Sequence, residues 1–177
     1  MIKLHLGCGD NIIPGYINVD LEYSPGIVPC DAQNLCYPSA YADLIYASHL
    51  LEHFSRHTYK RVLREWIRVL KPGGTLRLAV PDFDQAILHY ETTHKLEDIM
   101  GLVVGGQKND YDYHKVIFTY DKLKKDLESL GMRRVRYWDW RNTDHTSYDD
   151  YSQAYLPHMN KKTGRLMSLN LESTKSI

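Results

Sequence analysis

The amino-terminal part of the chain alternates short apolar runs with turns that contain glycine or proline. Apolar residues predict strands over 2–6 and 16–20, and Ile27 with Val28 indicates a short third strand. The compact apolar run 43–47 is typical of a strand that is buried on both faces, as in a parallel sheet. Strands repeated at these intervals predict an α/β architecture.

A strongly amphipathic helix is predicted next. Apolar residues recur every three or four positions over 59–70, and charged residues occupy the opposite face. Lys-Pro-Gly-Gly at 71–74 ends this helix, because proline cannot continue it and glycine adopts the left-handed cap. The apolar run 75–80 is then predicted to be another strand.

The rest of the chain is less regular. The segment 82–113 predicts one or two short helices and a glycine-containing loop, and Thr119 is placed to cap a further helix. Segments 134–140 and 165–172 are the last predicted strands. The pattern as a whole predicts an open, mostly parallel, Rossmann-like sheet of about seven strands, with the last strands forming an antiparallel edge.

Length and composition limit the function classes. A chain of 177 residues is expected to form one domain, residues 1–177. Lys plus Arg equals Asp plus Glu at 22 each, so the net charge gives no indication of general nucleic-acid binding. No apolar segment of the sequence predicts membrane insertion. Three cysteines are too few for a disulfide framework. We expect a cytoplasmic protein without a signal peptide, and its oligomeric state is left open.

The candidate site comes from the turns that follow the strands. Gly7-Cys8-Gly9 follows the first strand, Asp20 ends the second, and Ser48-His49 follows the fourth. The carboxyl ends of parallel strands form one edge, and ligands bind there where the strand order reverses. Glycines let a ligand approach bare backbone, and a carboxylate accepts hydrogen bonds from ribose hydroxyls. The sequence therefore predicts a nucleotide-type cleft.

Ordered motifs over residues 4–83 resemble the class I (Rossmann-like) S-adenosylmethionine-dependent methyltransferase family. They are Leu-Gly-Cys-Gly at 6–9, the acid Asp20, Cys-Asp-Ala-Gln-Asn-Leu at 30–35, the fourth-strand segment 41–53 and the helix–turn–strand 68–78. The resemblance implies S-adenosyl-L-methionine as cofactor, with Asp20 on the ribose and Asp31 near the adenine amino group. The residues that it implies contact the cofactor are Gly7, Cys8, Gly9, Asp20, Leu21, Asp31, Ala32, Ser48 and His49.

The first motif departs from the family pattern. Nine residues separate the first two strands, so the usual helix must shrink to a turn over 11–14. A third glycine is missing, and His5 stands where the family often has an acid. Recognition of the cofactor ammonium group would then depend on backbone carbonyls.

Methyl transfer from a sulfonium is a direct displacement, so the protein mainly aligns the reactants, and a hydroxyl acceptor needs a base. His49 is the candidate base; alternatively it caps the following short helix or lines the adenosine pocket. Asp82 orients the substrate or the base, or simply caps the next helix. His53 and His57 are four residues apart, but no third ligand is near them in the sequence, so no metal site is expected.

Substrate specificity is assigned to two predicted substrate-side insertions, 82–118 and 141–163. The second is rich in tyrosine and aspartate, which suit a sugar ring or an ordinary polar loop. We therefore expect a methyltransferase that acts on a small-molecule or glycan hydroxyl. The alternative is a catalytically inactive accessory protein that binds S-adenosylmethionine or S-adenosylhomocysteine. A nicotinamide dehydrogenase fits poorly, because the later glycine and the helix of its fingerprint are missing.

Overall fold

The computed structural model describes residues 1–177. Seven strands form one sheet in the order β3-β2-β1-β4-β5-β9-β6, and β7 and β8 form a separate pair. The elements, in chain order, are β1 (Lys3–Leu6), β2 (Ile17–Asp20), β3 (Ile27–Pro29), β4 (Ala42–Ser48), η1 (Leu51–His53), α1 (Tyr59–Val69), β5 (Leu70–Pro81), α2 (Phe83–Thr93), α3 (Leu96–Val104), α4 (Tyr120–Ser129), β6 (Met132–Tyr137), η2 (Trp140–Asn142), η3 (Tyr151–Gln153), β7 (Tyr155–Leu156), β8 (Arg165–Leu166) and β9 (Ser168–Lys175).

The sheet confirms the predicted fold class. Strands β3, β2, β1, β4 and β5 are all parallel, whereas β9 pairs antiparallel with both β5 and β6. The chain runs outward from β1 to β3 and then returns to place β4 on the other side of β1. The strand order therefore reverses between β1 and β4, and a ligand cleft is expected at their carboxyl ends.

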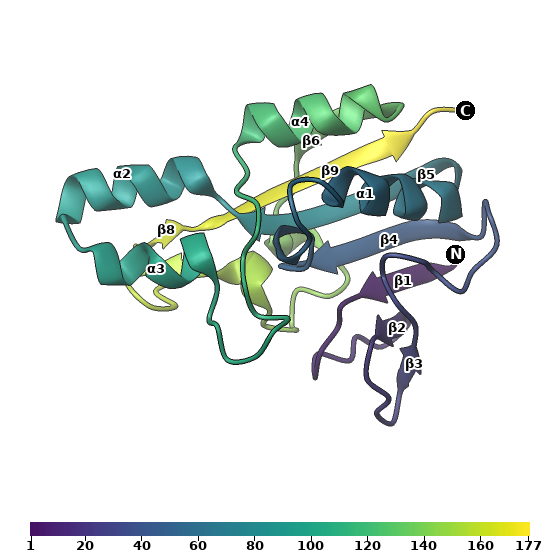
Figure 1. Cartoon of the computed structure of the whole chain (residues 1–177), viewed down its shortest axis with the longest axis horizontal. Helices are drawn as coiled ribbons and strands as arrows, with labels where there is room; N and C mark the ends of the chain where they lie inside the picture. Colours follow the sequence, from purple (N-terminus) through teal and green to yellow (C-terminus); the bar gives the residue numbers. More distant parts are fainter.

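Helices cover one face of the sheet, and α2 and α3 lie side by side at its end (Figure 1). The main core joins α1 and α4 to the strands, and Trp66 of α1 is fully buried in it. The Trp66 indole N–H donates to the carbonyl oxygen of Ala32 at 2.8 Å. This bond ties the segment after β3 to the core, and it thereby positions the predicted adenine-side residues.

The opposite face is covered by loops and aromatic side chains. Tyr46 is fully buried there, stacks on His5 at 5.2 Å and packs edge-on against Trp138. The Nδ1 atom of His5 lies 3.1 Å from Oδ1 of Asn18 on the neighbouring strand. His5, which replaces the acid of the family pattern, therefore joins β1 to β2 inside the core and does not line the cleft.

Some predicted boundaries were wrong. β5 begins at Leu70, before the predicted 75, because Leu70 already pairs with Ala42 ahead of an irregularity in the ladder. β6 ends at Tyr137, so Trp138 is buried outside a strand. The last long strand begins at Ser168. No helix joins β1 to β2, as the nine-residue spacing predicted.

Candidate functional site

A cleft of about 1000 Å³ lies at the carboxyl ends of the parallel strands. Most of the predicted cofactor-contact residues line it: Gly7, Gly9, Asp20, Leu21, Asp31, Ala32 and His49. Cys8 and Ser48 do not. Cys8 is buried, and burial raises the pKa of its thiol to about 11, so it is a small side chain in the turn rather than a reactive thiol.

The glycine turn is held to the end of β2 by hydrogen bonds. The backbone N–H of Gly9 donates to Oδ2 of Asp20 at 2.7 Å, and the N–H of Leu21 donates to Oδ1 at 2.7 Å. Gly7 and Gly9 both have positive φ, at 62° and 49°. A Cβ at Gly7 would approach the Leu50 side chain to 2.7 Å, whereas one at Gly9 would meet only open space. The turn therefore presents bare backbone to the cleft.

The adenine-side carboxylate is also held in place. Oδ1 of Asp31 accepts from the N–H of Gln33 at 2.8 Å, while the Ala32 carbonyl accepts from Trp66. Several further residues of the cleft belong to no motif of the sequence. They are Glu22, Tyr23, Ser24, Phe54, Asn109, Tyr111 and Lys115, and those from 109–115 reach the cleft only through the tertiary fold.

His49 stands at the end of β4 in a left-handed conformation, with φ of 49°. Its backbone N–H donates to the carbonyl oxygen of Ala79 on β5 at 2.8 Å. The ring lies between two polar groups: Nε2 is 3.1 Å from Oγ of Ser168, and Nδ1 is 3.3 Å from Oε1 of Glu52. Tyr151 packs beside the ring at 5.4 Å. The imidazole is therefore oriented from both sides.

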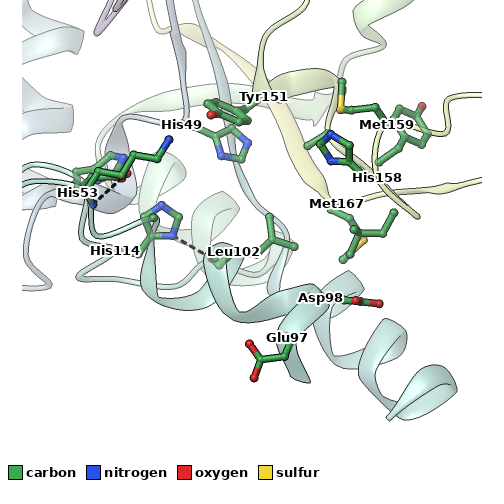
Figure 2. Close-up of a pocket in the computed structure, with 17 residues that line it drawn as sticks. His49, His53, Glu97, Asp98, Leu102, His114, Tyr151, His158, Met159 and Met167 are labelled. Atoms are coloured by element: carbon green, nitrogen blue, oxygen red, sulfur yellow. Dashed lines mark hydrogen bonds between the residues drawn. The ribbon is translucent and has the colours of Figure 1, made fainter. Parts of the chain in front are cut away.

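A second cavity, of about 430 Å³, adjoins the cleft (Figure 2). His49 and His53 line both. The other walls come from the two segments that were predicted as substrate-side insertions, 82–118 and 141–163, and from Met167. They are Glu97, Asp98, Gly101, Leu102, Gly106, Lys108, Asp112, His114, Tyr151, Ala154, Tyr155, Leu156, His158 and Met159.

Glu52, which the sequence analysis did not identify, lies beneath the junction of the two cavities. Its side chain is completely buried, and neither carboxylate oxygen has a hydrogen-bond partner. Burial raises the pKa of the Glu52 carboxyl, but the neighbouring His49, His53 and His114 outweigh burial and hold that pKa below its ordinary value. Burial in turn lowers the pKa of His114. The anionic Glu52 carboxylate is therefore surrounded by three histidine side chains.

Asp82 lies outside both cavities. Its carboxylate caps α2 by accepting from the backbone N–H of Gln85 at 3.2 Å, and burial raises its pKa. This geometry corresponds to the capping alternative of the sequence analysis. His57 is exposed and accepts from Nε–H of Arg56, and it lines neither cavity, whereas His53 lines both.

No helix in the structure combines the length and apolar character that a bilayer crossing requires.

Residues 15–78 match the family model described as a methyltransferase domain. The chain is 27% identical over 119 residues to ubiquinone/menaquinone biosynthesis C-methyltransferases UbiE of Ralstonia pickettii and Ralstonia nicotianae. That alignment covers 62% of this chain and 47% of each relative, so the chain matches about half the length of these curated proteins.

Solved structures share the fold. A Thermotoga maritima S-adenosylmethionine-dependent methyltransferase, described as a possible histamine N-methyltransferase, aligns with a TM-score of 0.65 at 15% identity, over 99% of this chain and 82% of that one. A Haloferax volcanii methyltransferase solved with the activator Trm112 gives 0.61 at 12% identity, over 99% and 82%. Human N-acetylserotonin methyltransferase in complex with S-adenosylmethionine gives 0.57 at 13% identity, over 99% and 48%.

The cleft suits an adenosyl cofactor, because it joins open glycine backbone to carboxylates at two successive strand ends and its volume is that of a small-molecule site. The family-model match over residues 15–78, the 27% identity to the curated relatives and the strand order make the chain similar to class I S-adenosylmethionine-dependent methyltransferases, and this similarity supports S-adenosyl-L-methionine as its cofactor.

Proposed function

We propose that this protein transfers a methyl group from S-adenosylmethionine to a hydroxyl group of a small molecule or glycan. The observation that carries the proposal is the junction of two cavities at His49 and His53. A methyltransferase needs one compartment for the cofactor and another for the acceptor, with an opening between them for the transferred group. The larger cleft, which contains the carboxylates at the strand ends, would hold the cofactor. The smaller cavity, which is lined by both apolar and polar side chains, would hold the acceptor.

The cleft residues would hold the cofactor in three places. Asp20 would accept from the ribose hydroxyls, because its two oxygens retain lone pairs beyond those used by the backbone N–H groups. Asp31 would lie on the adenine side, and the turn at Gly7–Gly9 would accommodate the methionine portion. When bound, the cofactor supplies an electrophilic methyl group on a sulfonium.

His49 is our candidate for the group that accepts the acceptor's proton. The Glu52 carboxylate beside Nδ1 would favour a proton on that nitrogen, which would leave Nε2 as the basic atom, with the Ser168 hydroxyl donating to Nε2 rather than to Asn170. Nε2 lies next to Oγ of Ser168, and the ring borders both cavities. Proton transfer by a positioned imidazole commonly contributes about 10²–10⁴-fold to rate.

The acceptor cavity mixes apolar and polar walls. Leu102, Met159 and Met167 provide apolar surface, while Tyr155 and Asp112 provide hydrogen-bonding groups. Such walls suit a ring that carries hydroxyl groups. The names of the curated relatives favour a second candidate, carbon methylation of a hydroxylated quinone-type ring, for which loss of a ring hydroxyl proton would likewise activate the acceptor.

Calorimetry with S-adenosylmethionine, S-adenosylhomocysteine and NAD tests the cofactor assignment. We expect both adenosyl sulfur compounds to bind and NAD not to bind; NAD binding without the others would contradict the proposal. Mass spectrometry of products from sugar, alcohol, phenol and hydroquinone panels then tests catalysis. Methylation at oxygen supports the first candidate, and methylation at ring carbon supports the second. Tight cofactor binding with no product across these panels would favour the inactive accessory protein.

A further inference from the structure

Three histidines surround the buried carboxylate of Glu52. His49 lies 3.3 Å from Oε1 through Nδ1, and His114 lies 3.9 Å from the same oxygen through Nε2. The rings of His53 and His114 pack edge to face with centroids 4.9 Å apart. His49 and His53 are four residues apart in the segment that follows β4, whereas His114 comes from the loop after α3, and Figure 2 shows the three labelled side chains near one another in the smaller cavity.

The hydrogen bonds of two of these rings define which nitrogen carries the proton. Nδ1 of His114 lies 3.0 Å from the carbonyl oxygen of Leu102, and Nδ1 of His53 lies 3.3 Å from that of Tyr113. A carbonyl oxygen only accepts, so Nδ1 must donate in both cases. Each neutral ring therefore has its free lone pair on Nε2. Metal-binding histidines are commonly oriented by this type of bond to a backbone carbonyl.

The cluster has fewer donors than its acceptors require. Nδ1 of His49 lies 3.3 Å from Oε1 of Glu52 without completing a hydrogen bond, Oε2 has no partner, and two imidazole lone pairs belong to the rings beside them. Buried polar groups in native proteins are almost always satisfied, so an orphaned carboxylate in this setting calls for a ligand. A cation would satisfy the carboxylate and both lone pairs together.

We propose that Glu52, His53 and His114 form a binding site for a divalent transition-metal ion such as Zn²⁺ or Mn²⁺. One ligand atom from each residue lies within 4.8 Å of the other two. Atoms bound to one ion at about 2.1 Å are about 3–4 Å apart, so small side-chain rotations would close the site. Two imidazole nitrogens and one carboxylate oxygen are a donor set that suits transition metals. In the structure His53 lies near Glu52 and His114. His57, which is four residues further along the chain, is not part of this group.

The position of the site would allow a bound ion to contact the acceptor. His53 and His114 line the acceptor cavity, and three protein ligands leave coordination positions open. An ion there would bind an oxygen of the acceptor and favour its deprotonated form. This consequence rests on the proposed function, whereas metal binding itself does not.

Metal binding is tested directly on the full-length protein without cofactor or acceptor. The metal-free protein, prepared with a chelator, is titrated with Co²⁺, whose visible absorption reports coordination, and with Zn²⁺ by calorimetry. We expect one ion per chain. His53→Ala and His114→Ala should each raise the Kd by about tenfold or more, and Glu52→Gln should do the same. His57→Ala and His158→Ala are controls, because the first is outside the cluster and the second lines the cavity without belonging to it.

The proposal is overturned if the parent protein binds no ion, or if His53→Ala and His114→Ala bind it as tightly as the two control variants do. His114 is outside every helix and strand, so His114→Ala decides the question should Glu52→Gln fail to fold. S-adenosylmethionine binding is measured in the same preparations. Metal binding without cofactor binding would contradict the proposed function alone, and cofactor binding without metal binding would overturn the metal site alone.

Discussion

The backbone N–H of Gly9 donates to the side chain of Asp20 at 2.7 Å, which connects the first strand-end turn to the second. The two residues are eleven positions apart and belong to neighbouring parallel strand ends. This bond replaces part of the support that a helix would give after the glycine turn. The compressed connection therefore still presents backbone and carboxylate to one cleft.

Gly9→Val should abolish binding of S-adenosylmethionine. Valine is strongly disfavoured at a φ of 49°, and its side chain would enter the open space beside the turn. Gly131→Val is the matched control, since Gly131 also has a positive φ and open space but lies outside the cleft. Calorimetry on both folded variants measures the effect; equal affinities would argue against the placement of the cofactor.

Asp20→Ala should weaken cofactor binding by about 100-fold, because it removes both an acceptor for hydroxyl groups and the bond that orders Gly9. Asp20→Asn retains an acceptor oxygen but loses the charge, so an intermediate affinity is expected. Asp10→Ala is a control, because Asp10 also lines the cleft. If Asp20→Ala bound as tightly as Asp10→Ala, the ribose assignment would fail.

His49→Gln should reduce kcat by about 10²-fold or more while leaving the cofactor Kd within a few-fold, if the imidazole accepts the acceptor's proton. Glutamine retains hydrogen bonding to Ser168 but cannot act as a base at neutral pH. His158→Gln, in the same cavity, is the comparison. Steady-state kinetics with an identified acceptor separates the two roles, since a loss confined to cofactor affinity would assign His49 to binding.

Acid should destabilise the fold through His145. This residue is 1% exposed, both ring nitrogens lack partners, and burial lowers its pKa to about 4. The unfolded state therefore binds a proton at a higher pH than the folded state does. Stability is complete above about pH 6.5 and declines towards pH 4, by up to about 3 kcal/mol for this group.

The comparison for that effect is His145→Phe, which keeps a ring against Tyr46 and cannot titrate. Urea unfolding at pH 7 and pH 5 should show a smaller loss of unfolding free energy in the variant than in the parent. Equal losses in the two proteins would assign the acid sensitivity to other groups.

The strands and the first helix could be predicted from local patterning. Strand runs with apolar alternation and the three-to-four spacing of α1 report burial directly, so β1, β2, β4 and α1 were predicted within about two residues. The predicted element boundaries were wrong mainly where pairing between strands, rather than the local sequence, decides where a strand begins. Leu70 belongs to β5 because Ala42 pairs with it, and the glycines at 73–74 mark an irregularity within that strand rather than a turn before it.

The shared cleft could likewise be predicted, because turns that follow parallel strands must emerge at one edge of the sheet. Gly9, Asp20 and Asp31 meet for that reason alone. The catalytic assignments were harder, since the sequence treats Asp82 and His49 alike as residues that follow strands. In three dimensions Asp82 turns back to cap α2, whereas His49 borders both cavities.

Periodicity and motif order were therefore enough to predict the strands, the parallel sheet and the edge where the larger cleft lies, because the periodicity of each element is local and the order of elements is read along the chain. The packing of distant segments established the rest. His114 is sixty-two positions beyond Glu52, and Ser168 is more than a hundred beyond His49, so no local pattern could place them together. Long-range contacts create the acceptor cavity and the orphaned carboxylate beneath it, and these become visible only in the folded chain.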